Sequence, residues 1–295
     1  MTRRVAGHGK LAGLARLLEN PRFEVYPTGK VEDAIARSLV PGTTVTVTAS
    51  PAKGLEATVA LTERLTARGY RVVPHLSARL LWDGAYLAEL VERLVACGVS
   101  DVFVPAGDAD PPAGPFDSAL PVLARLTELE SPFPQIGITG YPESHPRIGD
   151  DVTIQAMWDK RRHATYIVSN LCFDPATLGR WITRVRARGV SLPMYVGLAG
   201  PVERTRLLRM AARAGVSESA RFLAGHAQWL VRLGMPGGYQ PERFLSRAGP
   251  SLISPQAAVA GLHLYTFNQV AEAEAWRRRM LAGVGGEPAG SPATA

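Results

Sequence analysis

Cysteine is scarce in this sequence. Cys97 and Cys172 are its two cysteines, and neither belongs to a CxxC motif or to a His-rich spacing. The pattern around Cys97 is helical, and the pattern around Cys172 is typical of a strand. We therefore expect neither a disulfide bond nor a metal site.

Long apolar runs are also missing. The apolar stretches are short and broken by charged residues, well below the roughly 20 residues that a membrane helix needs. The opening MTRRVAGHGK contains no apolar segment of the signal-peptide type. We therefore expect a cytoplasmic protein with no membrane partner.

The basic residues do not cluster. The net charge is +7 and the pI is about 9.7, but the excess is arginine spread along several helical segments without exposed aromatics between them. This distribution argues against a nucleic-acid partner. A basic surface would still attract polyanionic small molecules such as dinucleotides.

A GxGxxG motif between a first strand and helix is absent as well, which argues against a doubly wound dinucleotide-binding sheet. The chain instead alternates short β-branched or apolar runs with helical patterns. We expect strands at residues 23–26, 43–48, 71–75, 101–106, 135–138, 165–168, 193–196 and 262–266. We expect helices at about 31–40, 51–68, 83–97, 118–129, 152–163, 175–188, 202–214 and 269–281.

About eight strand-then-helix units in 295 residues predict a (β/α)8 TIM barrel. We expect one barrel domain over residues 1–283, with residues 1–21 as an N-terminal helical extension. Residues 217–260 interrupt the alternation and are interpreted as a helical insertion before the last strand. The tail, residues 284–295, is mostly Gly, Pro, Ser and Ala, and we expect it to be disordered.

The stretch VFVPAGDADPP, residues 102–112, organises the candidate site. An apolar run leads directly into Gly107 and Asp108 and then into a Pro-rich loop, as when a buried strand ends in a carboxylate. Because a barrel builds its active site at the carboxyl ends of its strands, the polar residues there are candidates for chemistry. They are Glu24, Thr48, His75, Asp108, Tyr141, Glu143, His145, Asn170, Tyr265 and Asn268.

Each of these residues alone also fits a structural role. Asp108 fits a turn, Glu24 an ion pair, His75 the core and Tyr265 simple packing. Their joint placement at one edge of the barrel favours a functional site.

At these strand ends the sequence also carries a series of short motifs in a fixed order. Phe23–Pro27 resembles FEFFPP, Val45–Thr48 resembles VSVTYG, Pro74–Leu76 resembles PHLT, Gly107–Pro112 resembles RGDxPP, Tyr141–Pro146 resembles YPExHP, Ser169–Asp174 resembles TQFFFD, Val196–Leu198 resembles PGI, and Leu264–Asn268 resembles FYTLN. The series covers residues 22–270 and resembles the methylenetetrahydrofolate reductases.

This resemblance implies an oxidoreductase of one-carbon metabolism and methionine biosynthesis that reduces 5,10-methylenetetrahydrofolate with NAD(P)H through bound FAD. It implies Glu24 as the general acid that opens the folate ring, and Asp108 as the carboxylate that orients pterin and flavin. Asn170 and Tyr265 would contact the substrate. The FAD contacts would come from Thr48, His75, Gly107, Asp108, Tyr141, His145 and Lys160. The resemblance also implies a homo-oligomer.

The sequence departs from the family pattern at three positions. Ala49 replaces a tyrosine, Ala106 replaces an arginine, and Asn170 replaces a glutamine. Because the first two changes remove expected FAD contacts, direct hydride transfer without flavin, as in a divergent member, is an alternative. A weakly active folate-binding subunit is another. The sequence does not distinguish NADH from NADPH.

Overall fold

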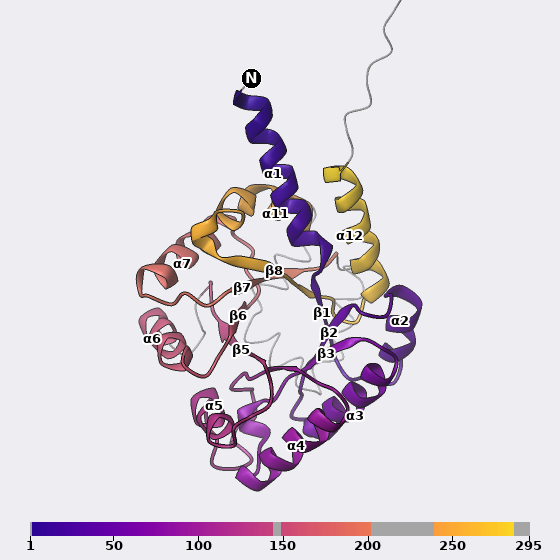
Figure 1. Ribbon diagram of the computed structural model, residues 1–295, viewed down its shortest axis with the longest axis vertical. Helices are drawn as coiled ribbons and strands as arrows, with labels where there is room; N and C mark the ends of the chain where they lie inside the picture. Colours follow the sequence, from indigo (N-terminus) through magenta and orange to yellow (C-terminus); the bar gives the residue numbers. More distant parts are fainter. Residues whose placement is uncertain (1, 144–148, 202–238, 286–295) are drawn as a thin grey trace, which may run out of the picture.

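The fold is a barrel of parallel strands surrounded by helices (Figure 1). The structure is a computed structural model and describes residues 2–143, 149–201 and 239–285. Within these residues eight parallel strands form one sheet in the order β3-β2-β1-β8-β7-β6-β5-β4. They are β1 (Arg22–Val25), β2 (Thr44–Val47), β3 (Arg71–Pro74), β4 (Asp101–Phe103), β5 (Gln135–Gly140), β6 (Tyr166–Ser169), β7 (Met194–Ala199) and β8 (Val259–Tyr265).

The two ends of this order meet just beyond β3. His75 forms a parallel bridge with Phe103 of β4, and the amide of Leu76 donates to the carbonyl of Phe103 at 2.8 Å. These contacts join the first and last strands of the sheet. The predicted (β/α)8 TIM barrel is therefore confirmed.

Helices cover the outside of the barrel (Figure 1). Their bounds are α1 (Thr2–Glu19), α2 (Val31–Ser38), α3 (Gly54–Ala67), α4 (Gly84–Ala96), α5 (Ala119–Glu128), α6 (Asp150–Lys160), α7 (Pro175–Ala187), α11 (Pro241–Leu252) and α12 (Val270–Gly285), with short 3-10 turns at Ala78–Leu80 and Pro255–Ala257. Helix α1 precedes the first strand and packs along α12. None of the described helices is long and apolar enough to cross a membrane.

Alternation along the strands separates the helix-facing core from the barrel interior. Phe23 and Val25 of β1 and Val45 and Val47 of β2 are buried in the main hydrophobic core. Their sequence neighbours, among them Glu24 and Thr46, must point to the other face, which is the inside of the barrel. The helix-facing layer is thus apolar, whereas the interior carries polar groups.

Local sequence signals fix the starts of two helices. The side chain of Asp83 accepts a hydrogen bond from the amide of Tyr86 at 2.8 Å, and Asp174 accepts from the amides of Ala176 and Thr177 at 3.1 Å each. Aspartate is a favoured N-cap because it satisfies amides that have no partner within the helix. These two caps start α4 and α7 close to the predicted positions.

Several predicted bounds were wrong. Helix α3 begins at Gly54 rather than at 51, because residues 50–54 form a turn in which the amides of Lys53 and Gly54 donate to the carbonyl of Ser50. Strand β4 ends at Phe103 rather than at 106, because the carbonyls of Pro105 and Ala106 accept from Ala78 and Arg79 instead.

Helix α6 spans 150–160 rather than 152–163, and α12 runs to Gly285, past the predicted start of the tail. The predicted helix at 202–214, the part of the insertion up to residue 238 and the rest of the tail, residues 286–295, lie outside the described residues. The later part of the insertion contains α11.

Candidate functional site

The candidate site is the mouth of the barrel, by which we mean the edge where the strands end. Glu24 lies one residue before the end of β1, Thr48 follows β2 and His75 follows β3. Tyr141 follows β5, Asn170 follows β6 and Tyr265 ends β8. Parallel strands bring these positions to the same edge.

The loop after β4 places Gly107 and Asp108 farther out. Because β4 ends early, Asp108 lies five positions beyond it and is exposed. Gly107 has a φ of +86°, and a Cβ on this residue would come within 2.9 Å of the Cβ of Ser77. Glycine is therefore required for the loop to pass this close to the end of β3.

One of the predicted site residues is not brought to this edge, and another lies outside the described residues. Lys160 ends α6, at the end of the helix that leads into the start of β6 and thus on the side opposite the mouth. Burial lowers the pKa of Lys160 to about 8. His145 lies outside the described residues.

The centre of the mouth is a carboxyl group between two imidazoles. Nε2 of His263, on β8, lies 2.9 Å from Oε2 of Glu24, and Nε2 of His75 lies 4.0 Å from the same oxygen. Glu24 and His75 are each 6% exposed and His263 is 1% exposed. Because water scarcely reaches these three groups, their charge states depend on one another.

Burial decides the charge of each member of this cluster. It raises the pKa of Glu24 from its ordinary 4.5 to about 7, with the charge of His75 opposing the rise. It lowers the pKa of His75 to about 4. It also lowers the pKa of His263 to about 3, and the positive charge of Arg22 contributes to this. Near neutral pH both imidazoles are therefore neutral. Glu24, whose pKa is about 7, is then partly protonated and partly ionised.

Phenol groups surround the carboxyl group. The pKa of Tyr26 is raised by burial and by the charges of Glu24 and Asp108. That of Tyr265 is raised by burial, Glu24, Tyr26 and Tyr141. Tyr26 and Tyr265 are therefore the two phenols that interact with the charge of Glu24, and Tyr141 and Asp108 interact with these tyrosines. The phenols stay protonated near neutral pH, and they supply hydroxyl groups and aromatic surface.

Two more predicted residues have local structural partners. Oδ1 of Asn170 accepts from the amide of Leu171 at 2.8 Å, and the hydroxyl of Tyr265 donates to the carbonyl of Ser169 at 3.2 Å. Thr48 is buried, and its hydroxyl has no hydrogen-bond partner among the described residues. The substrate and cofactor roles of Thr48, Asn170 and Tyr265 stay predictions.

His263 was missed as a site residue. It lies two positions before Tyr265, and alternate residues of a strand point to the same face. Once Tyr265 is placed at the mouth, the same alternation directs His263 into the barrel. The alternation of side chains along β8 was therefore the sequence signal that could have identified His263 as a site residue.

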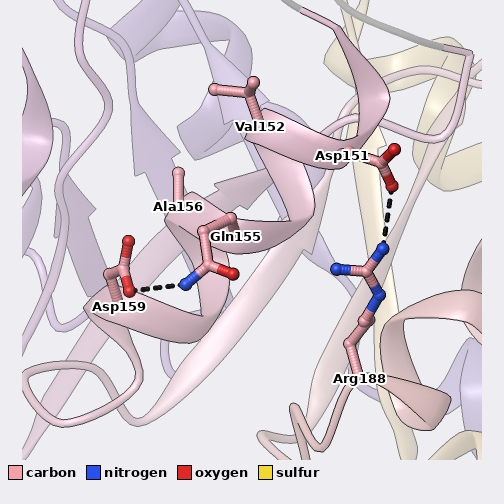
Figure 2. Close-up of a pocket in the computed structure, with 6 residues that line it drawn as sticks. All are labelled: Asp151, Val152, Gln155, Ala156, Asp159 and Arg188. Carbon is pink, nitrogen blue, oxygen red and sulfur yellow. Dashed lines mark hydrogen bonds and ion pairs between the residues drawn. The ribbon is translucent and has the colours of Figure 1, made fainter.

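Two surface hollows lie away from the mouth. One lies on the outer face of α6 and extends to Arg188 (Figure 2). In it Arg188 pairs with Asp151 at 3.0 Å, and Gln155 donates to Asp159 at 2.9 Å. A second is lined by residues at the start of β1 and β2, including Phe23, Thr43 and Thr44. Among the described residues, no group of three His, Cys, Asp or Glu side chains could hold a metal ion.

Comparison with known proteins supports the fold and no family. No family model matches the chain. Oxaloacetate acetylhydrolase is similar in structure, with 13% identity, a TM-score of 0.51, and coverage of 94% of this chain and 89% of that chain. A protein from Burkholderia cenocepacia J2315 named as a lyase/mutase has 16% identity, a TM-score of 0.47, and coverage of 93% and 84%. One from Toxoplasma gondii ME49 named as a deoxyribose-phosphate aldolase has 10% identity, a TM-score of 0.48, and coverage of 92% and 98%.

These findings contradict the predicted family. No family model supports a methylenetetrahydrofolate reductase, and the similar structure with a TM-score of 0.51 is named oxaloacetate acetylhydrolase. The predicted flavin-dependent reduction of methylenetetrahydrofolate, and with it the classification as an oxidoreductase of one-carbon metabolism, is therefore corrected. At these identities the likeness shows the fold alone, because one barrel fold carries many chemistries. FAD, NAD(P)H and the homo-oligomer rested on the resemblance and are untested predictions.

Proposed function

We propose that this barrel is an enzyme that moves a proton on a carbon atom next to a carbonyl group, with Glu24 as the general acid–base. The observation that carries the proposal is the buried Glu24 carboxyl group, whose pKa of about 7 lies near the pH at which an acid–base catalyst is most effective. An exposed glutamate is almost entirely ionised at this pH and returns a proton poorly.

The neutral His75 is suited to a second role. Its Nε2 atom is buried, lies 4.0 Å from Oε2 of Glu24 and has no hydrogen-bond partner among the described residues. A neutral imidazole that carries its hydrogen on Nε2 can donate to a carbonyl oxygen without first losing a proton to it. A base beside a neutral imidazole donor is an arrangement that supports enolisation.

The proposed reaction proceeds through an enolate. The Glu24 carboxylate takes the proton from the substrate carbon, and the electron pair of that C–H bond forms a C=C bond. The carbonyl oxygen gains the negative charge and accepts the hydrogen bond from His75, which stabilises the enolate. The protonated Glu24 then returns the proton to the same carbon, the C=C bond supplies the electron pair of the new C–H bond, and the carbonyl group re-forms.

The surroundings of Glu24 favour a small, mostly uncharged substrate. Tyr26, Tyr141 and Tyr265 present rings and hydroxyl groups near neutral pH, and Thr48 adds a hydroxyl group. Among the described residues near the mouth, Lys53 donates to the carbonyl of Pro27. Arg79 likewise donates to the carbonyls of Ala109 and Asp117. Because both cations already have these partners, they favour an uncharged substrate over an anionic one.

Deuterium exchange tests the proposal without knowledge of the natural substrate. The protein is incubated in D2O with a panel of small aldehydes, ketones and oxo acids, and loss of the proton next to the carbonyl is followed by NMR. We expect exchange of at least one compound, with a rate that rises up to a pH of about 7 and then levels off, because the carboxylate is the base.

Two variants make this experiment specific. Glu24→Gln keeps the size of the side chain but cannot take a proton, and the exchange rate should fall by about 10² or more. Glu128→Gln changes an exposed glutamate of α5 that pairs with Arg125 on the surface, and it should exchange at the wild-type rate. Exchange that persists in Glu24→Gln, or no exchange with any compound, contradicts the proposal.

A further inference from the structure

Below Glu24 a column of buried ionisable side chains continues into the barrel. Oε2 of Glu24 shares a hydrogen bond with His263. His263 on β8 lies opposite Arg22 on β1 in the register of the two paired strands. Arg22 in turn pairs with Asp101 of β4 at 3.0 Å. The column therefore runs from the mouth towards the side where the strands begin.

Arg22 is held in place on several sides. Its guanidinium group lies 4.1 Å from the ring centre of Tyr166 and 3.9 Å from that of Tyr195, and the side chain is 7% exposed. The hydroxyl of Tyr166 donates to Asp101 at 2.7 Å. A guanidinium group keeps its proton in proteins, so the charge below His263 is permanent.

This fixed positive charge constrains His263. A second proton on the imidazole would place two cations side by side in a dry interior, which is strongly unfavourable. The ring is therefore neutral and carries one N–H. That hydrogen sits either on Nε2, where it points to Glu24, or on Nδ1.

The two ring nitrogens differ in their partners. Nδ1 of His263 is buried and has no hydrogen-bond partner among the described residues, and the same holds for Nη1 of Arg22, which is a donor. A hydrogen on Nδ1 would thus be a buried N–H without an acceptor in the field of a cation. A hydrogen on Nε2 has an acceptor 2.9 Å away in Oε2 of Glu24.

We propose that His263 is a positioning residue for Glu24: it stays neutral and donates from Nε2 to Oε2, so that the exchangeable proton resides on Oε1. The positive charge of Arg22 keeps His263 from taking a second proton and so holds the imidazole in its neutral form. The inference rests on the proposed acid–base role of Glu24, and it adds which oxygen carries the proton and what decides this. Among the described residues no hydrogen bond to Oε1 competes with the substrate.

The other titratable and charged groups near Glu24 do not take over the role of His263. Besides His263 they are His75 after β3, Tyr26 after β1, Tyr265 at the end of β8, Tyr141 after β5 and Asp108 in the loop after β4. Burial lowers the pKa of His75 to about 4 and raises that of each tyrosine. The imidazole of His75 and the three phenol groups therefore keep their neutral state between pH 6 and 8.

Long-range 1H–15N NMR of the histidine side chains tests the inference directly. The chain has six histidines, and the signal that disappears in His263→Gln identifies His263. We expect the neutral tautomer with hydrogen on Nε2, unchanged from pH 5 to 9. A hydrogen on Nδ1, or protonation of His263 above about pH 6, overturns the inference.

Variants of Arg22 test the lower part of the column. Arg22→Lys keeps the charge and should leave His263 neutral down to pH 5. Arg22→Met removes the charge, and the titration midpoint of His263 should then rise by about one pH unit or more. If Arg22→Met does not fold, the wild-type tautomer and Arg22→Lys still decide the outcome. Protonation of His263 above pH 6 in Arg22→Lys would count against the inference.

The Glu24 carboxyl group provides a second measurement, with 13C-labelled glutamate and Glu24→Gln for assignment. His263→Gln keeps a donor on its Nε2 and should titrate as the wild type does. His263→Leu removes the donor to the carboxylate, and the midpoint of Glu24 should rise by about one pH unit. Unchanged titration in His263→Leu contradicts the positioning role. These measurements need no substrate, so failure of the deuterium exchange leaves them interpretable, and the reverse also holds.

Discussion

Glu24 and His263 are 239 residues apart in the sequence and share a hydrogen bond of 2.9 Å between Oε2 and Nε2. They lie on β1 and β8, the first and last strands in the sequence, which are paired neighbours in the sheet. The acid–base centre therefore forms only when the two ends of the chain come together. Burial in the closed barrel is also what brings the pKa of Glu24 to about 7, so the fold itself prepares the group for catalysis.

The first prediction concerns stability and pH. Burial raises the pKa of Glu24 from 4.5 to about 7 in the folded chain, so between these values the folded state binds more protons than the unfolded state. The stability that Glu24 contributes is fully present below pH 4.5 and is lost as the pH rises through 7, by on the order of 3 kcal/mol.

Glu24→Gln removes this dependence. Urea unfolding at pH 5 and pH 8 should show the variant gaining stability relative to the wild type at the higher pH. Glu128→Gln, on the surface of α5, should show no such difference between the two pH values, because its pair with Arg125 is exposed. An equal offset at pH 5 and pH 8 for Glu24→Gln would mean that the carboxyl group is ionised throughout.

Much of the fold was predictable because its signals are local. Runs such as Thr44–Val47 favour strands, and Asp83 and Asp174 cap helices at the expected positions. The edge at which Glu24 and His75 lie also follows from the order of strand and helix. Pro51 misled the prediction, since proline fits a turn as well as the first turn of a helix.

The interior of the barrel was not predictable in the same way. The cluster of Arg22, Asp101, Tyr166 and Tyr195 joins four strands, and which side chains meet there depends on register and stagger around the barrel. The family resemblance failed for a related reason. Polar residues followed by Gly- or Pro-rich loops recur at the strand ends of many unrelated barrels, so short motifs there do not identify a family.

A second prediction concerns the ion pair inside the barrel. Asp101→Asn keeps the shape of the side chain but leaves the charge of Arg22, which is 7% exposed, without its counterion. We expect a loss of about 3 to 5 kcal/mol in the free energy of unfolding. Asp151→Asn is the matched control, because Asp151 pairs with Arg188 at the same 3.0 Å but is 85% exposed. Its loss should stay below about 1 kcal/mol. Similar losses for the two variants in chemical unfolding would show that burial does not strengthen the inner pair.

The last prediction concerns Asn268, which fixes the chain just after Glu24. Its Oδ1 accepts from the amide of Tyr26 at 2.8 Å, and its Nδ2 donates to the carbonyl of Tyr26 at 3.1 Å. The side chain thus binds Tyr26 as a neighbouring strand would. Asn268 also has a φ of +60°, a conformation that asparagine tolerates better than most residues do.

Three variants separate these two contributions. Asn268→Ala loses the hydrogen bonds and keeps the unfavourable φ, and we expect a loss of about 2 to 3 kcal/mol in the free energy of unfolding. Asn268→Gly loses the same bonds but adopts the positive φ freely, so its loss should be about 1 kcal/mol smaller. Asn268→Asp keeps the acceptor for the amide of Tyr26 but turns a second oxygen towards the carbonyl of Tyr26 in place of the donor, so its loss should be smaller than that of the alanine variant without returning to wild-type stability. Equal losses for the alanine and glycine variants would show that the positive φ contributes nothing, and a loss for the aspartate variant as large as that for alanine would show that the acceptor does not matter.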